Sequence, residues 1–551
     1  MLSKHGSKLP DSRKKLLPTL QKIRQHPILI LLIINIVVGL FTFRDYGLSW
    51  DEPLFYDYAS ALGYAYSPGE WFSGNFNLEN AFGASATDHA NRGPAYIVIA
   101  HPIEALFESQ GLDNASAWHL LNFLTFQLGV YLLYRLAKRW MSPFAALATA
   151  ALFSWQPLLW GHAFINPKDP PFLVFFIGAM CFGFEMVDKV AQGGVPAAVP
   201  QGCSAKDGGR SNSEKPLGLI IVAAFFLGIA TSIRVLGPLA GVLVGAYALS
   251  HFKEIKISAL VKYFAVYTGL TILIAFLTWP YLWTNPLQKF IEAFGFMSAN
   301  PTQLNVLFNG QIYRAYELPR RYLPILLGYT LTEPVWILFI IGLLIGFWKS
   351  NNQQRITLAL VLSWFLIPAA YVILRKPPMY DGYRHFLFML PPIFIFAGFA
   401  FEKLFEVIKV RWIPIALIVI LLAPGIYSAI QLHPYEYAYY NSFIGGTGGA
   451  FRTYETEYWL TCYREGVLEF NKKAPEGAQL FVKREPYIAA YYASPNITIR
   501  DYRTEFKDIQ SGDFILVNTR SNEDRSGFRD APIFLEVERD GAVFCVIKQV
   551  P

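Results

Sequence analysis

The stretch PILILLIINIVVGLFTFRDYGLSWDE, residues 27–52, decides the fold of this chain. Its first part, Pro27 to Phe43, is apolar almost throughout, and such a run can cross the ~30 Å hydrocarbon core of a bilayer. The basic segment before this apolar run is too long for the start of a signal peptide, and no small-residue cleavage site follows the run. We therefore expect a retained first membrane span, followed closely by the carboxylates of Asp51 and Glu52.

Apolar runs of the same kind recur along the whole chain of 551 residues. Hydrophobic residues make up 54% of the sequence and charged residues only 16%, whereas soluble domains have about 25% charged residues. The pattern predicts an all-α polytopic membrane protein with about 11 transmembrane helices. The predicted spans are residues 27–43, 116–137, 143–160, 170–187, 217–236, 237–250, 262–280, 331–348, 356–374, 385–401 and 412–432.

Lysine and arginine concentrate in alternate loops, as the positive-inside rule expects of cytoplasmic loops. The basic segment 1–26 is therefore assigned to the cytoplasm. We expect a multi-pass protein of the cell (inner) membrane. Ala95 to Phe107 is interpreted as an interfacial helix, because counting it as a span would place Lys138 and Arg139 outside. The odd number of spans then places the C-terminus outside. This orientation signal accounts for the net charge of +7, which requires no nucleic-acid partner.

We divide the chain into the basic N-terminus 1–26, a transmembrane domain 27–432 and an extracytoplasmic α/β domain 433–551. Within the transmembrane domain, residues 44–115 form a large first outer loop, and the Gly/Ser/Pro-rich residues 192–216 form a disordered inner linker.

The extracytoplasmic domain is predicted from a fall in hydropathy after His433. Tyr458 to Lys473 has helical spacing. The β-rich segments are Gln479–Lys483, Ile497–Tyr502, Asp513–Asn518 and Val543–Lys548. Cys462 and Cys545 either pair in an oxidising compartment or remain two buried thiols.

Acidic residues cluster in the first outer loop, where Asp51 and Glu52 follow the first span. Adjacent carboxylates can hold a divalent cation such as Mg²⁺ or Mn²⁺, or one of them can act as a general base toward an acceptor hydroxyl. A solvated acidic loop that simply lacks Lys and Arg is equally consistent with the sequence.

A second acidic site precedes the fourth span, where Lys168-Asp169 is followed by two prolines that suit the first turn of a helix. Asp169 either caps this helix or contributes to a site beside Asp51. His89 and His162 are imidazoles on the same side that either reach a substrate or metal, or serve as hydrogen-bonded interfacial residues.

Arginines also stand at the outer membrane boundary, against the usual charge bias. Arg234 ends the fifth span, and Arg384-His385 precedes the tenth. Cations there can bind an anionic phosphate near the lipid headgroups. Pairing with an acidic neighbour or with native phospholipid explains Arg234 equally well.

Taken in order and on one side of the membrane, these segments resemble the C-type glycosyltransferase superfamily (GT-C). The branch they resemble holds dolichyl-phosphate-mannose-protein mannosyltransferases and bacterial lipid A aminoarabinose transferases. The matching segments are Asp51-Glu52, the His89 segment, Asn166-Pro167-Lys168-Asp169, 228–234, Tyr383-Arg384-His385, 434–441 and 454–459. The first outer loop departs from the family, because it reads Asp88-His89-Ala90 where the family has His-Pro-Pro.

The resemblance implies transfer of a sugar from a polyprenyl-phosphate carrier to a lipid, glycan or protein acceptor at the outer face, with inversion. Asp51 is then the base, and Asp169 orients the acceptor or assists. The substrate-binding residues are Lys168, Arg234 and Arg384 on the leaving phosphate, with Glu52, His385 and His89 as further candidates, and Asp51 with Glu52 as a metal site.

Two other readings remain open at this stage. A secondary transporter would also be polytopic, although it usually places ionisable groups near mid-bilayer, where these runs carry almost none. A noncatalytic or ligase-type relative of the same fold would have the same pattern of spans.

Overall fold

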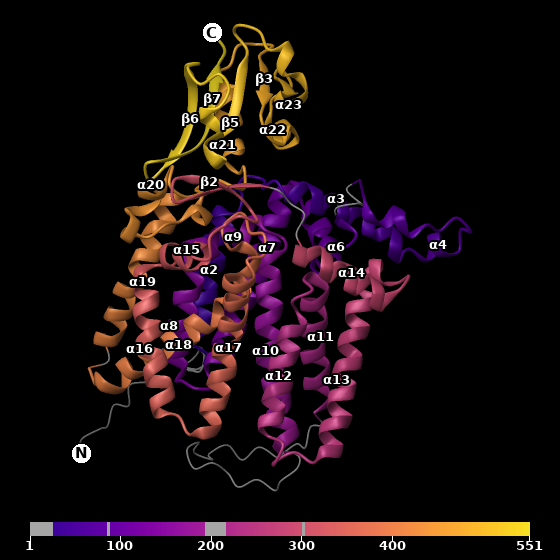
Figure 1. The fold of residues 1–551 in the computed structure, drawn as a ribbon, viewed down its shortest axis with the longest axis vertical. Helices are drawn as coiled ribbons and strands as arrows, with labels where there is room; N and C mark the ends of the chain where they lie inside the picture. The colour runs from indigo at the N-terminus through magenta and orange to yellow at the C-terminus, as the bar shows by residue number, and fades with distance from the viewer. Residues whose placement is uncertain (1–25, 85–88, 193–215, 300–303, 411) are drawn as a thin grey trace, which may run out of the picture.

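The structure is a computed structural model that describes residues 26–84, 89–192, 216–299, 304–410 and 412–551. It is a bundle of apolar helices with a small domain on one end (Figure 1). Each of the eleven predicted spans lies largely in helix. These helices are α2 Ile28–Thr42, α7 Asn114–Ala137, α8 Pro143–Ser154, α9 Pro157–Ile165, α10 Asp169–Gln192, α11 Leu217–Ile233, α12 Pro238–Ser250, α13 Ile257–Leu277, α16 Glu333–Lys349, α17 Asn352–Arg375, α18 Pro391–Val407 and α19 Trp412–Leu432.

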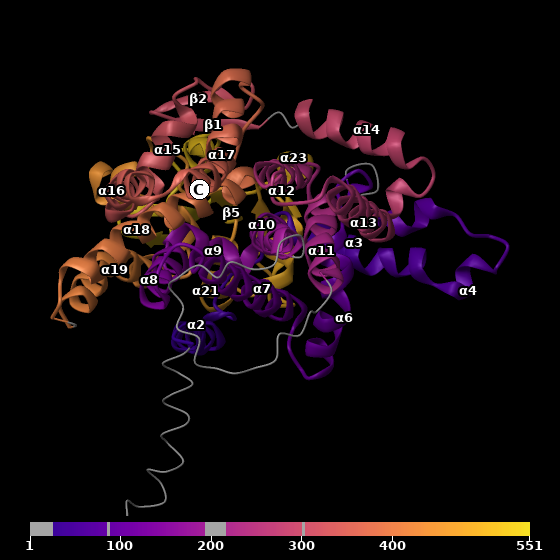
Figure 2. The same cartoon turned by 90° about the horizontal axis from the view of Figure 1, so that it is seen from below.

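Among the described residues, five of these helices are long and apolar enough to cross a membrane, or six if a bent pair counts as one span. α10 lies at the centre of the bundle, where it contacts α7, α11 and α12 (Figure 2). Almost every residue of α10 is buried, as expected of a helix that is apolar all round. The chain is thus an integral membrane protein by composition and fold.

One predicted span is broken in the structure, and the chain bends sharply just before the helix of another. The predicted span 143–160 divides into α8 and α9, because Pro157 begins a new helix. α16 is preceded by α15 (Tyr322–Thr330) at an angle of 106°. The side chain of Gln156 joins the two breaks, since its amide donates to Thr332 Oγ1 at 3.0 Å and accepts from the Thr332 N–H at 3.0 Å. A buried break of this kind needs side-chain partners for its polar groups.

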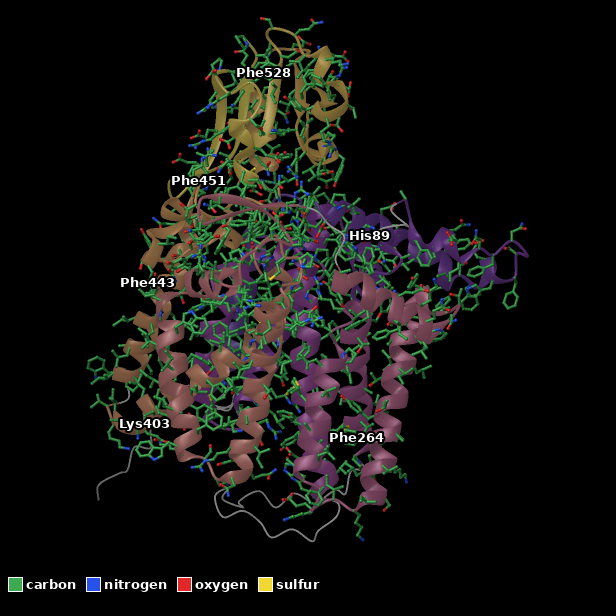
Figure 3. All side chains as sticks on the ribbon, in the orientation of Figure 1. His89, Phe264, Lys403, Phe443, Phe451 and Phe528 are labelled. Atoms are coloured by element: carbon green, nitrogen blue, oxygen red, sulfur yellow. The ribbon has the colours of Figure 1, made fainter. Side chains whose placement is uncertain are left out.

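The predicted outer segments gather at the end of the bundle that carries the small domain. His89 lies near this end, whereas Phe264 and Lys403 lie toward the opposite end (Figure 3). The predicted interfacial stretch 95–107 is helical, as α6 (Ala95–Ser109). The expected basic N-terminus 1–26 and inner linker 192–216 lie outside the described residues, except for His26, Gln192 and Pro216.

Between α2 and α6, the first outer loop folds into short helices. They are α3 Glu52–Leu62, η1 Gly63–Tyr66, α4 Pro68–Trp71 and η2 Leu78–Phe82. Between α13 and α15 come η3 Pro280–Leu282, α14 Pro286–Ala299 and a hairpin of β1 Asn305–Phe308 and β2 Gln311–Arg314, which the sequence did not predict. Both α4 and α14 lie at the rim of the bundle (Figure 2).

The C-terminal domain is α/β, as predicted. Its sheet has the strand order β4-β3-β5-β7-β6, in which β3 pairs in parallel with β4 and β5, and β7 pairs antiparallel with β5 and β6. The strands are β3 Gln479–Val482, β4 Thr498–Asp501, β5 Phe514–Asn518, β6 Ile533–Arg539 and β7 Ala542–Gln549; β6 was not predicted. Cys462 on α21 (Cys462–Lys473) and Cys545 on β7 are buried free thiols.

Candidate active site

Asp51 and Glu52 are neighbours in sequence, but their side chains have separate surroundings. Asp51 stands at the N-terminus of α3 without capping it, and its carboxylate accepts a hydrogen bond from Arg384 Nη1 at 3.0 Å. Glu52 is fully buried, and its oxygens accept from the Ser49 N–H and the Tyr56 hydroxyl, both at 2.6 Å. Only Asp51 of this pair therefore faces the other candidate residues.

Asp169 is the first residue of α10, and it does not cap the helix as the alternative interpretation supposed. The side-chain oxygen of Asn166 performs that function by accepting from the backbone N–H groups of Lys168 at 3.1 Å and Asp169 at 2.9 Å. The Asp169 carboxylate instead accepts from Asn166 Nδ2 at 2.9 Å and pairs with Arg234 and Arg384. The Asn166-Pro167-Lys168-Asp169 motif thus aims a carboxylate into the site.

Arg384 is the residue on which the site converges. It begins η4 (Arg384–Met389) and is buried beneath the C-terminal domain, with its guanidinium carbon 4.4 Å from the centre of the Trp459 ring. Besides Asp51, its Nη1 donates to Asp169 at 3.3 Å, and its Nε donates to Asp381 at 3.1 Å. One guanidinium therefore holds three carboxylates from three different segments, the geometry for which arginine is suited.

The pairs extend on both sides of Arg384. Arg234 pairs with Asp169 where α11 ends, and Arg520 Nη2 lies 2.6 Å from Asp381 Oδ1. We call the sequence Arg234–Asp169–Arg384–Asp381–Arg520 the ion-pair chain, with Asp51 as a branch on Arg384. It joins the helix bundle to the C-terminal domain through alternating charges.

A pocket opens on one side of Arg384, and we call it the open pocket. It encloses about 1010 Å³, part of which is open to solvent. Its polar wall is rich in cations, while α14 and the segment after α13 give it an apolar wall. The polar lining includes Asp51, Arg92, Lys168, Arg234, Arg384 and His385, and the apolar lining includes Val235, Leu236, Trp279, Phe294, Phe296 and Met297.

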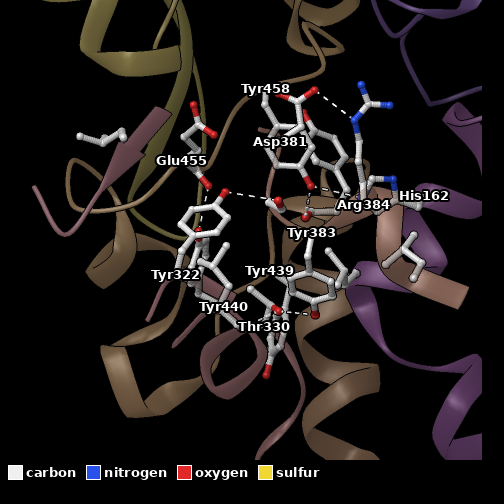
Figure 4. Close-up of a pocket in the computed structure, with 16 residues that line it drawn as sticks. His162, Tyr322, Thr330, Asp381, Tyr383, Arg384, Tyr439, Tyr440, Glu455 and Tyr458 are labelled. Atoms are coloured by element: carbon white, nitrogen blue, oxygen red, sulfur yellow. Dashed lines mark hydrogen bonds and ion pairs between the residues drawn. The ribbon is translucent and has the colours of Figure 1, made fainter. Parts of the chain in front are cut away.

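A second pocket lies on the other side of Arg384, and we call it the tyrosine pocket (Figure 4). It is lined by Tyr322, Tyr383, Tyr437, Tyr439, Tyr440 and Tyr458, together with His162, Asp381, Arg384 and Glu455. The carboxylate of Glu455 is buried without a hydrogen-bond partner among the described residues. Burial raises the pKa of Glu455 to about 8, against the effect of Arg520, which lowers it.

Lys168 and His89 lie beside the open pocket in buried positions. Burial lowers the pKa of Lys168 well below its usual value, and Arg234 and Arg92 lower it further. Its ammonium lies 5.3 Å from the centre of the Phe55 ring. His89 stacks on Tyr58 with ring centres 5.8 Å apart, and burial lowers the His89 pKa to about 4, so this imidazole is neutral at pH 7.

The expected Mg²⁺ or Mn²⁺ site at Asp51 and Glu52 does not fit these donors. Both Glu52 oxygens accept hydrogen bonds within the helix start, and Asp51 faces a guanidinium. The described residues also contain no group of three or more His, Cys, Asp or Glu side chains that could hold a metal ion. A cation would in addition meet the charges of Lys168, Arg234 and Arg384.

Three residues of the site were not foreseen. Arg92 lines the open pocket because the following Gly93 packs so closely on the Ser232 carbonyl that a Cβ would lie 1.4 Å from it. Asp381 stands three residues before Arg384 in the sequence, so its position beside Arg384 was available as a signal. Arg520 has no such signal, because its neighbours Thr519 and Ser521 are typical of a surface loop.

No protein-family model and no curated protein matches this chain. Among solved structures, the oligosaccharyltransferase of Archaeoglobus fulgidus with a tethered acceptor peptide aligns with a TM-score of 0.52 and 9% identity, over 92% of this chain and 70% of that chain. ArnT from Cupriavidus metallidurans, in the apo state and bound to undecaprenyl phosphate, aligns with a TM-score of 0.47 and 13% identity, over 94% of this chain and 97% of that one. The likeness to the oligosaccharyltransferase shows that this chain shares the overall fold of that membrane protein.

Proposed function

We propose that this chain is a membrane glycosyltransferase that moves a sugar from a polyprenyl-phosphate carrier to an acceptor at the outer face, with inversion. The observation that carries the proposal is the open pocket, which combines a cationic wall, an apolar wall and the Asp51 carboxylate. A fold alone does not specify a reaction, so the argument rests on this site.

The open pocket suits a ligand that is anionic at one end and apolar at the other. Lys168, Arg234, Arg384 and His385 supply hydrogen-bond donors of the kind that bind phosphate. Phe294, Phe296 and Met297 supply a surface for the first isoprene units of the carrier. A polyprenyl phosphate has this combination of groups, and it reaches the site from the bilayer.

Asp51 acts as the general base in this proposal. The acceptor hydroxyl or amine gives a proton to the Asp51 carboxylate as its oxygen or nitrogen forms a bond to the anomeric carbon. The bond from that carbon to the phosphate oxygen breaks on the opposite face, and the electron pair leaves with the phosphate. Because lipid phosphate leaves without protonation, no second carboxylic acid is required, in contrast to glycoside hydrolysis.

The surrounding cations perform the electrostatic part of the reaction. Negative charge develops on the phosphate as the bond breaks, and fixed donors aimed at this charge commonly contribute most to the rate. Arg384, held by three carboxylates, is oriented before the substrate arrives. Asp169 fixes Arg234 and Arg384 together and orients the acceptor.

The rival functions place the charges differently. A transporter is expected to hold its ionisable groups near mid-bilayer, whereas the ion-pair chain lies at the end of the bundle beneath the C-terminal domain. A noncatalytic relative of the same fold remains as the second candidate, and it predicts that Asp51→Asn changes nothing.

The experiment supplies purified protein with a panel of polyprenyl-phosphate sugars and acceptors, and follows release of polyprenyl phosphate. Asp51→Asn should lower turnover by roughly 10²- to 10⁴-fold, the size of a general-base contribution. Asp57→Asn is the matched control, because Asp57 lies exposed in the same helix. Equal turnover of wild type and Asp51→Asn would remove Asp51 as the base.

A further inference from the structure

Arg520 brings the C-terminal domain into the site. It begins η8 (Arg520–Arg525), after β5, yet only 2% of its surface is exposed. Its Nη2 lies 2.6 Å from Asp381 Oδ1, and its Nη1 donates to the Tyr458 carbonyl at 3.1 Å. Its guanidinium carbon lies 5.1 Å from the centre of the Trp50 ring, next to Asp51.

The segment after Arg520 has an energetically unfavourable backbone conformation, and this conformation holds the arginine in place. Ser521 and Asn522 both have left-handed backbone conformations, with φ of 50° and 59°. Such conformations are uncommon for residues other than glycine and persist only where the surroundings impose them. Here Ser521 Oγ donates to the Asn305 carbonyl on β1 at 3.0 Å, and Arg452 pairs with Asp524 at 2.6 Å.

The same domain also holds the segment that carries Asp51. The Trp50 N–H donates to the Trp459 carbonyl at 3.0 Å, and the Tyr487 hydroxyl donates to the Trp50 carbonyl at 3.0 Å. A Cβ on Gly47 would lie 2.1 Å from the Thr461 carbonyl oxygen, so the backbones meet closely there. The contacts of Arg520 are thus part of a continuous interface over the site.

Charge balance gives Arg520 a specific task. The ion-pair chain and its branch contain three carboxylates, Asp51, Asp169 and Asp381, and three guanidinium groups, Arg234, Arg384 and Arg520. Without Arg520, Asp381 would be a buried carboxylate that keeps Arg384 as its ion-pair partner, and one negative charge would be unbalanced. Arg384 would then be drawn toward Asp381 and away from the open pocket.

We infer that Arg520 is a positioning residue of the C-terminal domain, which neutralises Asp381 and thereby leaves Arg384 directed at the anionic substrate. The inference rests on the proposed function for the identity of that anion. According to this inference, the C-terminal domain contributes a residue to the site and does not only cover it.

The test measures binding of farnesyl phosphate, a short polyprenyl phosphate, to the full-length protein in detergent. Arg520→Gln should weaken binding about tenfold or more, and Arg520→Gln/Asp381→Asn should return the dissociation constant to within about threefold of wild type, because the second change removes the unbalanced charge. Arg503→Gln is the control, since Arg503 is half exposed in the same domain and pairs with Asp501. A purely structural role for Arg520 would not be rescued by Asp381→Asn.

Hydrogen–deuterium exchange provides a readout that needs no ligand. Exchange in residues 376–390 should rise in Arg520→Gln and remain at the wild-type level in Arg503→Gln. Unchanged binding and exchange in Arg520→Gln, or lost binding that Asp381→Asn does not restore, would overturn the inference.

The outcomes separate this inference from the proposed function. If wild type fails to bind farnesyl phosphate and releases no polyprenyl phosphate from any donor, the proposed function is wrong, while the exchange experiment still decides the role of Arg520. If Arg520→Gln does not fold, Arg520→Met replaces it, because it also removes the positive charge that faces Asp381. Weaker binding or faster exchange in Arg520→Met supports the inference, and the absence of both changes overturns it.

Discussion

The two pockets on either side of Arg384 share one guanidinium and differ in almost everything else. The open pocket places Lys168, Arg234 and His385 opposite an apolar wall. The tyrosine pocket places Asp381 and Glu455 among hydroxyl groups and lacks other arginines or lysines in its described lining. An anion is therefore stabilised more strongly on the open side of Arg384, where further cations line the pocket, than on the tyrosine side.

The two pockets also differ in what their charged residues do, because those of one can bind a ligand and those of the other hold Arg384. Lys168 in the open pocket forms no ion pair with a carboxylate among the described residues, and it is available to a ligand, whereas Arg234 and Arg384 are each paired with Asp169. Carboxylates next to the tyrosine pocket, such as Asp381, are occupied in holding Arg384. The comparison predicts that substitutions in the open pocket change the affinity for phosphate. Substitutions in the tyrosine pocket should change mainly the stability of the protein and the dependence of that stability on pH.

The largest effect is expected at the residue that the two pockets share. Arg384→Gln removes a proposed donor to the leaving phosphate and leaves three carboxylates, two of them buried, without their common partner. Turnover should fall by about 10³-fold or more, and unfolding should become easier by roughly 3–5 kcal/mol. Release of polyprenyl phosphate measures the loss of turnover, and thermal unfolding measures the loss of stability. Wild-type turnover in Arg384→Gln would contradict the role given to Arg384 between the two pockets.

A smaller effect is expected at Lys168, on the open side. Lys168→Met should weaken binding of polyprenyl phosphate by roughly 10- to 100-fold, the size of a charge-assisted hydrogen bond. It should also stabilise the protein, because burial lowers the Lys168 pKa and thus makes its charged form costly. The folded protein binds fewer protons here than the unfolded chain, so wild-type stability should rise with pH toward the ordinary lysine pKa of about 10.4.

Melting temperatures of the wild type and Lys168→Met from pH 6 to pH 10 check this prediction. The pH-dependent rise should be present in the wild type and reduced in the variant. A variant that loses stability while keeping its affinity would assign Lys168 to structure alone.

The smallest effect on affinity is expected at Glu455, on the tyrosine side. Its pKa is raised to about 8, so the folded protein keeps a proton that the unfolded chain loses above the ordinary carboxyl pKa of about 4.3. Stability should therefore fall as pH rises between these values. Glu455→Gln should raise the melting temperature at pH 9 by a few degrees while affinity for polyprenyl phosphate stays within about twofold. A large loss of affinity would place the phosphate on this side instead.

The sequence predicted most charged residues of the open pocket one by one, whereas Tyr437, Glu455 and Tyr458 of the tyrosine pocket entered only within the segments 434–441 and 454–459. Asp51, Asp169, Arg234 and Arg384 each stand at or near the end of an apolar run on one predicted side, and sidedness alone was sufficient to group them. Glu52 was grouped wrongly with Asp51, because adjacent residues at a helix start have different directions and Tyr56 lies one turn along its own face.

The remaining residues depend on contacts that no local pattern contains. Arg520 reaches Asp381 only because the C-terminal domain packs on the bundle, and the polar neighbours of Arg520 predict an exposed loop. The sequence also did not reveal the break after Ser154. Pro157 suits the first turn of a new helix, but a proline is equally suitable after the end of a continuous apolar run, so Pro157 alone does not indicate a break.

The most direct test of the central claim is an experimental structure of the protein with a bound polyprenyl phosphate. The account predicts a phosphate within hydrogen-bond distance of Lys168, Arg234 and Arg384, with the first isoprene units against Phe294 and Met297. A phosphate in the tyrosine pocket, or at the opposite end of the helix bundle, would contradict it.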